Sequence, residues 1–348
     1  MKRLVLIALA LLLVLATPLA AQNFDLGGFS DSFETLSAEV AGDLTFNSTL
    51  GLNWSDGHIG NFPHFGVGVT VGATTVPFEA VNAVLQDTVR ISLPAEIDTL
   101  AQQFGIPIPG LMAEARLGGF GIPFDIGVKY GEFLPEFEAL VNLQNIGLTL
   151  DYLVAGADVR FRLVEESGLV PLISVGGGVN YMEGGIGLTG LLGGPQQIEI
   201  DLSPFPNVLL EMDDPSFNFT WSAFTIDLKA QVSKNLWIVT PYAGFGASLG
   251  STTVGGGLSA PNFTIDGNEA NPAEIEQLLQ DLEDANFEVP EETFSAEGFN
   301  LQAVTDGWSF RAYGGLSLNL FFIRTDITAM YDIASGALGG SVNLRFQI

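Results

Sequence analysis

The C-terminal stretch from Trp308 to Ile348 alternates apolar and polar side chains in three runs, 308–320, 323–331 and 338–348. An alternation of period two predicts β-strands with one apolar and one polar face. The apolar face continues to Ile348, the last residue, with Phe346 two positions before it. The chain is therefore expected to end on a strand that is half apolar.

The same alternation predicts eight strands upstream, at 44–54, 65–73, 111–119, 122–130, 148–163, 170–181, 217–233 and 236–249. The phase changes between Trp221 and Phe224, which indicates a β-bulge or a strand that continues above the bilayer. The long links are 77–110, 131–144, 183–216 and 251–307, and short links alternate with them.

A chain that ends in this way resembles bacterial outer-membrane β-barrels. The resemblance implies an all-β transmembrane antiparallel barrel in the cell outer membrane, with membrane lipid around it. It also implies insertion by the barrel assembly machinery through the C-terminal strand. Composition agrees, because 47% hydrophobic residues beside a net charge of -28 fit a wall that faces lipid at every second residue.

The number of strands is left open by the count of eleven, because single-chain bacterial barrels have an even number. Either residues 22–41 contain a twelfth strand, or 44–54 lies outside the wall and the number is ten. We predict about twelve strands, within a range of ten to fourteen, with short amphipathic helices in the long outer loops.

The N-terminal residues indicate export. Lys2 and Arg3, the apolar run 4–16 and the small residues up to Ala21 are typical of a signal peptide, with cleavage expected near Ala21. Residues 22–42 are then an N-terminal segment that is either a luminal plug or an extra strand, and 43–348 is the barrel with long loops 77–110, 183–216 and 251–307.

Three apolar stripes at helical spacing predict helices in the outer loops. Asn271 is the expected cap of one, with Pro272 in its first turn. The stripes consist of Phe78, Val81 and Leu85; Ile97, Leu100 and Phe104; and Ile275, Leu278, Leu279 and Leu282. They either pack on one another as a lid or form an apolar entry groove. The second arrangement resembles uptake channels of the FadL type for hydrophobic compounds, which implies hydrophobic small molecules as partners.

The charges that alternation directs into the lumen suggest the candidate site. Its members are a basic belt, Arg116, Arg160, Arg162, Lys229, Arg324 and Arg345, and the acidic partners Asp158, Asp227 and Asp326. Each acid lies two residues from a base on its own strand, so the pairs Asp158–Arg160, Asp227–Lys229 and Asp326–Arg324 are expected. Charges in a narrow lumen need partners, so the belt is either a structural ion-pair lattice or a constriction that holds a carboxylate or selects anions.

No catalytic residues, metal site or cofactor are predicted. Gly246-Ala247-Ser248-Leu249-Gly250 matches a nucleophile-elbow pattern but lies in an expected strand. The strongly acidic balance argues against a nucleic-acid partner.

The sequence therefore predicts a non-enzymatic, porin-like transporter for small or hydrophobic, fatty-acid-like solutes. An open path past Gly66, Gly68, Gly72, Gly176, Gly244 and Gly246 would favour this function. The alternative is a non-transporting barrel that anchors surface loops for adhesion or envelope structure, and a filled lumen would favour it.

Overall fold

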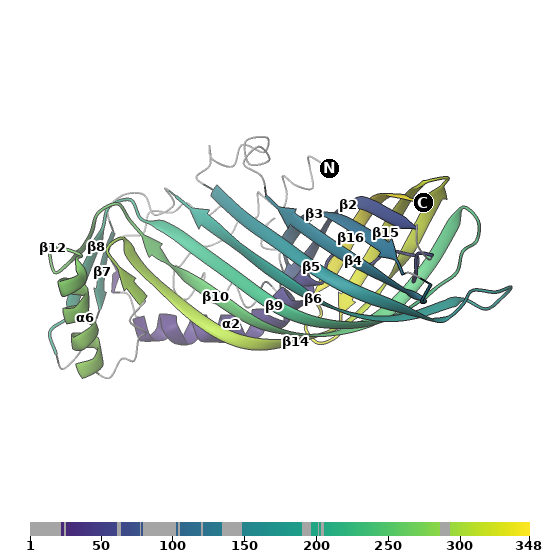
Figure 1. Ribbon diagram of the computed structural model, residues 1–348. Helices are drawn as coiled ribbons and strands as arrows, with labels where there is room; N and C mark the ends of the chain where they lie inside the picture. The colour runs from purple at the N-terminus through teal and green to yellow at the C-terminus, as the bar shows by residue number, and fades with distance from the viewer. Residues whose placement is uncertain are drawn as a thin grey trace.

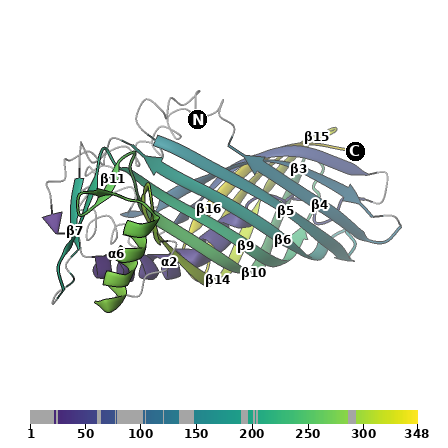
Figure 2. The ribbon, with the colours of Figure 1, turned by 60° about the vertical axis from the view of Figure 1, so that its left-hand side comes forward.

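The computed structural model describes residues 22–23, 26–60, 64–76, 78, 102–103, 105–119, 121–133, 148–189, 196–200, 202, 205–285 and 293–348. Most of this chain forms one closed antiparallel barrel with a helix inside it (Figures 1 and 2).

Ten strands make the wall, and each is hydrogen-bonded to a neighbour on both sides. In chain order they are β2 (Phe65–Val76), β3 (Ile106–Gly118), β4 (Phe124–Glu132), β5 (Leu148–Val164), β6 (Leu172–Leu188), β9 (Ser216–Ser233), β10 (Val239–Ser259), β14 (Gly298–Leu320), β15 (Ile323–Asp332) and β16 (Leu338–Gln347). The pairing of β16 with β2 closes the wall, so it has no free sheet edge. The preferred number of twelve strands was wrong, and the alternative of ten, with the segment before residue 55 outside the wall, is confirmed.

The two faces of the wall follow the alternation in the sequence. On β9, Phe224, Ile226 and Leu228 point outward and are more than half exposed, while Thr225 and Asp227 between them are buried. Apolar side chains face outward in the same way on the other wall strands, for example Val71 on β2 and Ile327 on β15. A closed wall with an apolar outer surface has the construction of a membrane-spanning barrel.

The wall is much taller on one side than on the other. β14 has 23 residues and β10 has 21, whereas β15 and β16 have 10 each. The long strands occupy parts of 183–216 and 251–307, which were predicted to be loops, and they project beyond the short ones at the end away from the C-terminus (Figure 1).

No bulge interrupts β9, because its register with β6 and β10 runs without a shift. The bulge predicted at the change of phase was wrong, and the alternative of a continuing strand agrees with the structure. Trp221 lies inward like Asp227, so the phase is constant and the lumen itself changes from polar to apolar.

A second, five-stranded sheet and a helix lie at the tall end of the barrel (Figure 1). The sheet contains β1 (Gln22–Asn23), β7 (Gln196–Ile200), β8 (Val208–Met212), β11 (Phe263–Ile265) and β12 (Asn268–Glu269), and we refer to these five strands as the outer sheet. The two-residue β13 (Phe294–Ser295) is not part of it and pairs with β14 of the wall. The helix is α6 (Pro272–Asp284).

Of the three predicted loop helices, the one that begins after Asn271 is confirmed as α6. The Asn271 side chain accepts hydrogen bonds from the amides of Ala273 and Glu274, and Leu278 and Leu282 are buried. Phe78 is also buried. Val81, Leu85, Ile97, Leu100 and Phe104 lie outside the described residues.

Helix α2 (Leu26–Ser48) lies inside the barrel, where a strand had been predicted from residue 44. Phe33, Leu36, Val40 and Leu44 are buried at helical spacing. Its side chains bond to strands on different sides of the wall: Asn47 to Thr74 of β2 at 2.6 Å, and Ser48 to Thr225 of β9 at 2.9 Å. In the described part of the chain, no helix has the length and apolar character needed to cross a membrane.

The helix and β14 approach each other closely at Gly307. A Cβ atom built there would lie 2.4 Å from the backbone carbon of Ala41. Glycine is therefore needed at this contact, because any side chain would push helix and wall apart.

We expect Gly307→Ala to lower the free energy of unfolding by about 1–3 kcal/mol through overpacking. The measurement is urea unfolding of the barrel in lipid vesicles, followed by tryptophan fluorescence. Gly340→Ala is the matched control, because the nearest atom to its added Cβ is the Thr328 carbonyl oxygen at 3.5 Å, an ordinary contact. Equal losses in the two variants would contradict the close approach.

Candidate functional site: a plug bound in the lumen

The chain does not leave the lumen where α2 ends. Gly51 and Leu52 have positive φ angles of 86° and 54°, and they turn the chain into an extended segment that is buried along most of its length up to residue 60. We call residues 26–60, which comprise α2 and this segment, the plug.

Basic side chains of the wall donate hydrogen bonds to backbone carbonyl groups of the plug. Lys129 donates to the oxygens of Ser48 and Leu50, both at 2.6 Å, and Lys229 donates to the oxygen of Leu52 at 3.1 Å. Lys129 thereby binds the C-terminal end of α2, where carbonyl groups lack helical partners and carry partial negative charge. The wall thus recognises the backbone of the plug through positive charge.

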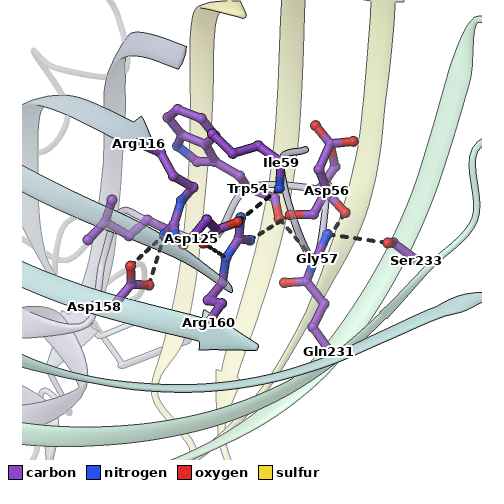
Figure 3. A network of polar contacts seen from close by, with 12 residues as sticks. Trp54, Asp56, Gly57, Ile59, Arg116, Asp125, Asp158, Arg160, Gln231 and Ser233 are labelled. Atoms are coloured by element: carbon purple, nitrogen blue, oxygen red, sulfur yellow. Dashed lines mark hydrogen bonds and ion pairs between the residues drawn. The ribbon is translucent and has the colours of Figure 1, made fainter. Parts of the chain in front are cut away.

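Carboxylates of the wall accept hydrogen bonds from the plug in turn. Glu114 accepts from the Leu52 amide at 3.0 Å and from the indole N–H of Trp54. Asp125 accepts from the Ile59 amide at 2.9 Å (Figure 3). The wall therefore supplies both hydrogen-bond donors and hydrogen-bond acceptors to the plug.

Two plug side chains make the remaining strong contacts. Asp56 pairs with Arg324 at 2.8 Å and with Arg345 at 3.0 Å. The Trp54 ring lies between two guanidinium groups, with Arg345 4.6 Å and Arg116 5.5 Å from the ring centroid. Cation–π attraction of this kind is strongest where water is excluded, as it is around the buried Trp54.

The predicted luminal charges lie close together, but they pair differently from the prediction. Asp158 pairs with Arg116 and Lys229, both at 2.7 Å. Asp227 pairs with Arg311, and Asp326 pairs with Arg345. Arg160, the expected partner of Asp158, pairs instead with Asp125 at 2.8 Å.

The expected pairs along single strands were therefore wrong. Residues i and i+2 of one strand are separated by two rises of about 3.3 Å, and their side chains stand parallel. Side chains on neighbouring strands approach more closely, at about 4.5–5.5 Å between Cβ atoms. Arg162 lies apart from the others, with its side chain 25% exposed and paired with Glu165.

The glycines expected to line an open path are covered by side chains. A Cβ atom at Gly66 would lie 2.7 Å from the Trp54 ring, and one at Gly246 would lie 2.6 Å from the Arg311 guanidinium carbon. Gly176 and Gly244 face Arg160 and Tyr313 in the same way, while Gly68 and Gly72 lie against Arg345 and Ser341. The path past these positions is closed in the structure.

Asp43 is a plug residue whose carboxyl group has no hydrogen-bond partner among the described wall residues. It is fully buried, and neither of its carboxylate oxygens has a hydrogen-bond partner among the described residues. Burial raises the pKa of Asp43 to about 7; the nearby Ser335 hydroxyl, which is not close enough to complete a hydrogen bond, lowers it in part, and the charge of Asp332 raises it. Asp43 lies on the plug helix, not on a wall strand.

Several residues of this site were not predicted from the sequence. Glu114 and Asp125 have the same strand parity as Arg116 and Lys129, so alternation could have placed them in the lumen. Asp43, Trp54 and Asp56 gave no signal, because their segment was interpreted as a strand and a turn.

A groove of about 590 Å³ also lies on the wall, and outward-facing residues of β5, β6 and β9 contribute most of its lining. Three carboxylates, Glu132, Asp151 and Glu183, are among its described lining residues, and none of those residues is basic. This groove offers no counter-charge to an anionic ligand.

No family model matches this chain, and no curated protein matches it in sequence. Solved barrels that resemble it include the translocator domain of the autotransporter NalP from Neisseria meningitidis, with 10% identity, TM-score 0.28, and coverage of 82% of this chain and 88% of that chain. The CymD monoaromatic hydrocarbon channel has 9% identity, TM-score 0.25, and coverage of 93% and 97%.

A Pseudomonas aeruginosa FadL homologue has 7% identity, TM-score 0.23, and coverage of 95% and 99%. The chain is a closed antiparallel barrel by its own strand pairing, and the solved structures that it resembles are outer-membrane barrels, among them a translocator domain and hydrophobic-compound channels. At these TM-scores the likeness carries no conclusion about activity.

We expect Lys129→Met to loosen the plug, because the Ser48 and Leu50 carbonyl groups lose a charged donor that contributes about 1.5–3 kcal/mol. Amide hydrogen exchange of residues 49–55 should accelerate by about ten- to a hundredfold. Lys234→Met is the control, since Lys234 binds carbonyl groups of the turn at Gly168 and Val170, outside the plug. Unchanged exchange in Lys129→Met would refute the role of this lysine in binding the plug.

Proposed function

We propose that the protein is an outer-membrane transporter for small, apolar solutes that is closed at rest by its own plug. The observation that supports this most directly is the chemistry of the plug's binding site. The segment after α2 is bound through hydrogen bonds and ion pairs to Lys129, Glu114, Asp125 and Arg345.

Binding through polar contacts allows this segment to be released from the wall. Hydrogen bonds within a protein add little net free energy, because water can replace each partner when the contact opens. A segment packed only by apolar contacts would lose its burial on moving, and nothing would compensate it. The segment after α2, which is bound by polar contacts, can therefore leave its place in a lumen that then fills with water.

An apolar, uncharged solute fits the structure better than a fatty acid. The basic belt already holds the protein's own carboxylates Asp56, Asp158 and Asp326, and Arg311 holds Asp227. At the tall end of the barrel the lumen is apolar instead, with Trp221, Val254 and Leu301 buried there. With a net charge of -28, the protein would also repel an anionic head group.

The anchor function remains the second candidate, and the outer sheet favours it. Ile198, Leu210 and Phe263 of that sheet are buried in the same apolar cluster as α2. A barrel filled by a helix and continuous with a folded outer layer could present that layer at the cell surface without any transport.

A disulfide across the plug separates the two functions. The chain has no cysteine, and the Ser48 and Thr225 hydroxyl oxygens are 2.9 Å apart. We expect Ser48→Cys with Thr225→Cys to form a disulfide that holds α2 to β9. Vesicles containing the unmodified barrel should take up a neutral hydrocarbon, the oxidised variant should not, and reduction should restore uptake.

Conductance in planar bilayers completes the test, with and without a long-chain fatty acid. We expect silence from the resting barrel and current after the plug is released by a denaturant pulse. Steady conductance of the oxidised variant would contradict a plug that closes the lumen. If uptake is absent from both the unmodified and the reduced protein, the anchor function is correct.

A further inference from the structure

The buried carboxyl group of Asp43 is the feature of the plug that binding alone does not explain. Every other charged plug contact described above has a partner of opposite charge or a hydrogen bond. A buried, ionised carboxylate without a partner costs several kcal/mol, so such a group either keeps its proton or finds a cation.

The neighbour of Asp43 on the wall is itself an acid. Asp332 ends β15 and is 1% exposed. It accepts hydrogen bonds from the Ser309 hydroxyl at 2.5 Å and from the amides of Ala334 and Ser335 at 2.9 and 3.0 Å. Both carboxylate oxygens of Asp332 thus accept hydrogen bonds, whereas neither oxygen of Asp43 has a donor among the described residues.

The other charged side chains that lie near α2 on β9 and β14 already have ion-pair partners. On β14 and β9, Arg311 and Asp227 pair with each other at 2.7 Å, and Lys229 pairs with Asp158. Strands β2 and β10, which also contact the helix, carry no Asp, Glu, Lys, Arg or His. Glu39, one turn before Asp43 on α2, is exposed.

We propose that Asp43 and Asp332 form a proton-operated latch, in which the protonated Asp43 keeps α2 against the wall and loss of its proton releases the plug. This inference rests on the movable plug of the proposed function and names the chemical signal that would move it. Ionisation would place two carboxylates together in a closed space, and their repulsion is relieved only if the helix moves away.

The direction of the pH effect follows from linkage. The docked Asp43 keeps its proton up to a pH of about 7, whereas an undocked one ionises near ~4. Between these values the undocked plug binds fewer protons, so docking weakens as pH rises, by up to about tenfold per pH unit. Docking is strongest in acid, and above about pH 7 no further loss is expected.

A single cysteine on the helix reports the latch directly. Ser37 is fully buried, with its hydroxyl 3.3 Å from that of Thr305. The variant Ser37→Cys would carry the only thiol of the chain. Its reaction with dithiodipyridine is measured in the refolded full-length barrel, relative to the same thiol in the urea-unfolded protein at each pH.

We expect the relative labelling rate to rise about ten- to a hundredfold from pH 5 to pH 7 and then to level off. Adding Asp43→Asn should abolish the rise, because the amide cannot ionise. Asp332→Asn should move the rise to lower pH, because the nearby negative charge that favours the protonated form of Asp43 is removed. An unchanged profile, or a shift to higher pH, would exclude Asp332 from the latch. Glu39→Gln should leave the profile unchanged.

Three results would overturn the latch. One is labelling that does not depend on pH, and another is a rise that survives Asp43→Asn. The third is suppression of labelling at pH 8 by millimolar Ca²⁺, which would assign the two carboxylates to a cation instead of a proton. The heat-dependent gel shift of a folded barrel shows at each pH that the wall is intact.

The two proposals fail separately. Loss of solute uptake with a preserved pH profile would leave the latch in place and remove the transport function. Uptake that responds to the disulfide but not to pH would support the transport function and remove the latch.

Discussion

The need to pair charges inside a closed wall governs this structure. A barrel exposes its apolar residues to lipid, so every Lys, Arg, Asp and Glu of the inner face is confined to a narrow lumen. Arg116, Lys129, Arg160, Arg311 and Arg345 are all buried there. Their desolvation is compensated only when each finds an anion or a carbonyl oxygen.

The wall satisfies part of this need by itself, through Asp125, Asp158, Asp227 and Asp326. The plug satisfies the rest. Lys129 has no carboxylate in hydrogen-bond contact among the described residues, and the carbonyl groups at the end of α2 take that place. Arg324 depends on Asp56 of the plug. Wall and plug are thus electrostatically incomplete without each other.

Geometry explains why a helix fills this lumen. Eight strands enclose a space that side chains alone can fill, and the diameter grows with strand number. Ten strands therefore leave additional room, which α2 occupies along the tall side formed by β10 and β14 (Figure 2). Small residues at Ala41, Gly42 and Gly307 allow the close approach. Among the described residues, Asp43 is the buried carboxyl group with neither oxygen hydrogen-bonded.

The alternation of side chains was enough to predict the strands, their apolar outer face and the inward direction of Arg116, Lys229 and Arg345. These properties are local, because a strand places successive side chains on opposite faces whatever its neighbours are. The helix cap at Asn271 could also be predicted, because its hydrogen bonds reach only residues two and three positions along the chain. Only the tertiary structure decided the ion pairs, because they depend on which strands are neighbours and in what register. The fold likewise set the state of residues 44–54, whose apolar pattern also fits a wall strand: inside the lumen 44–48 end α2, and 49–54 continue as the extended segment.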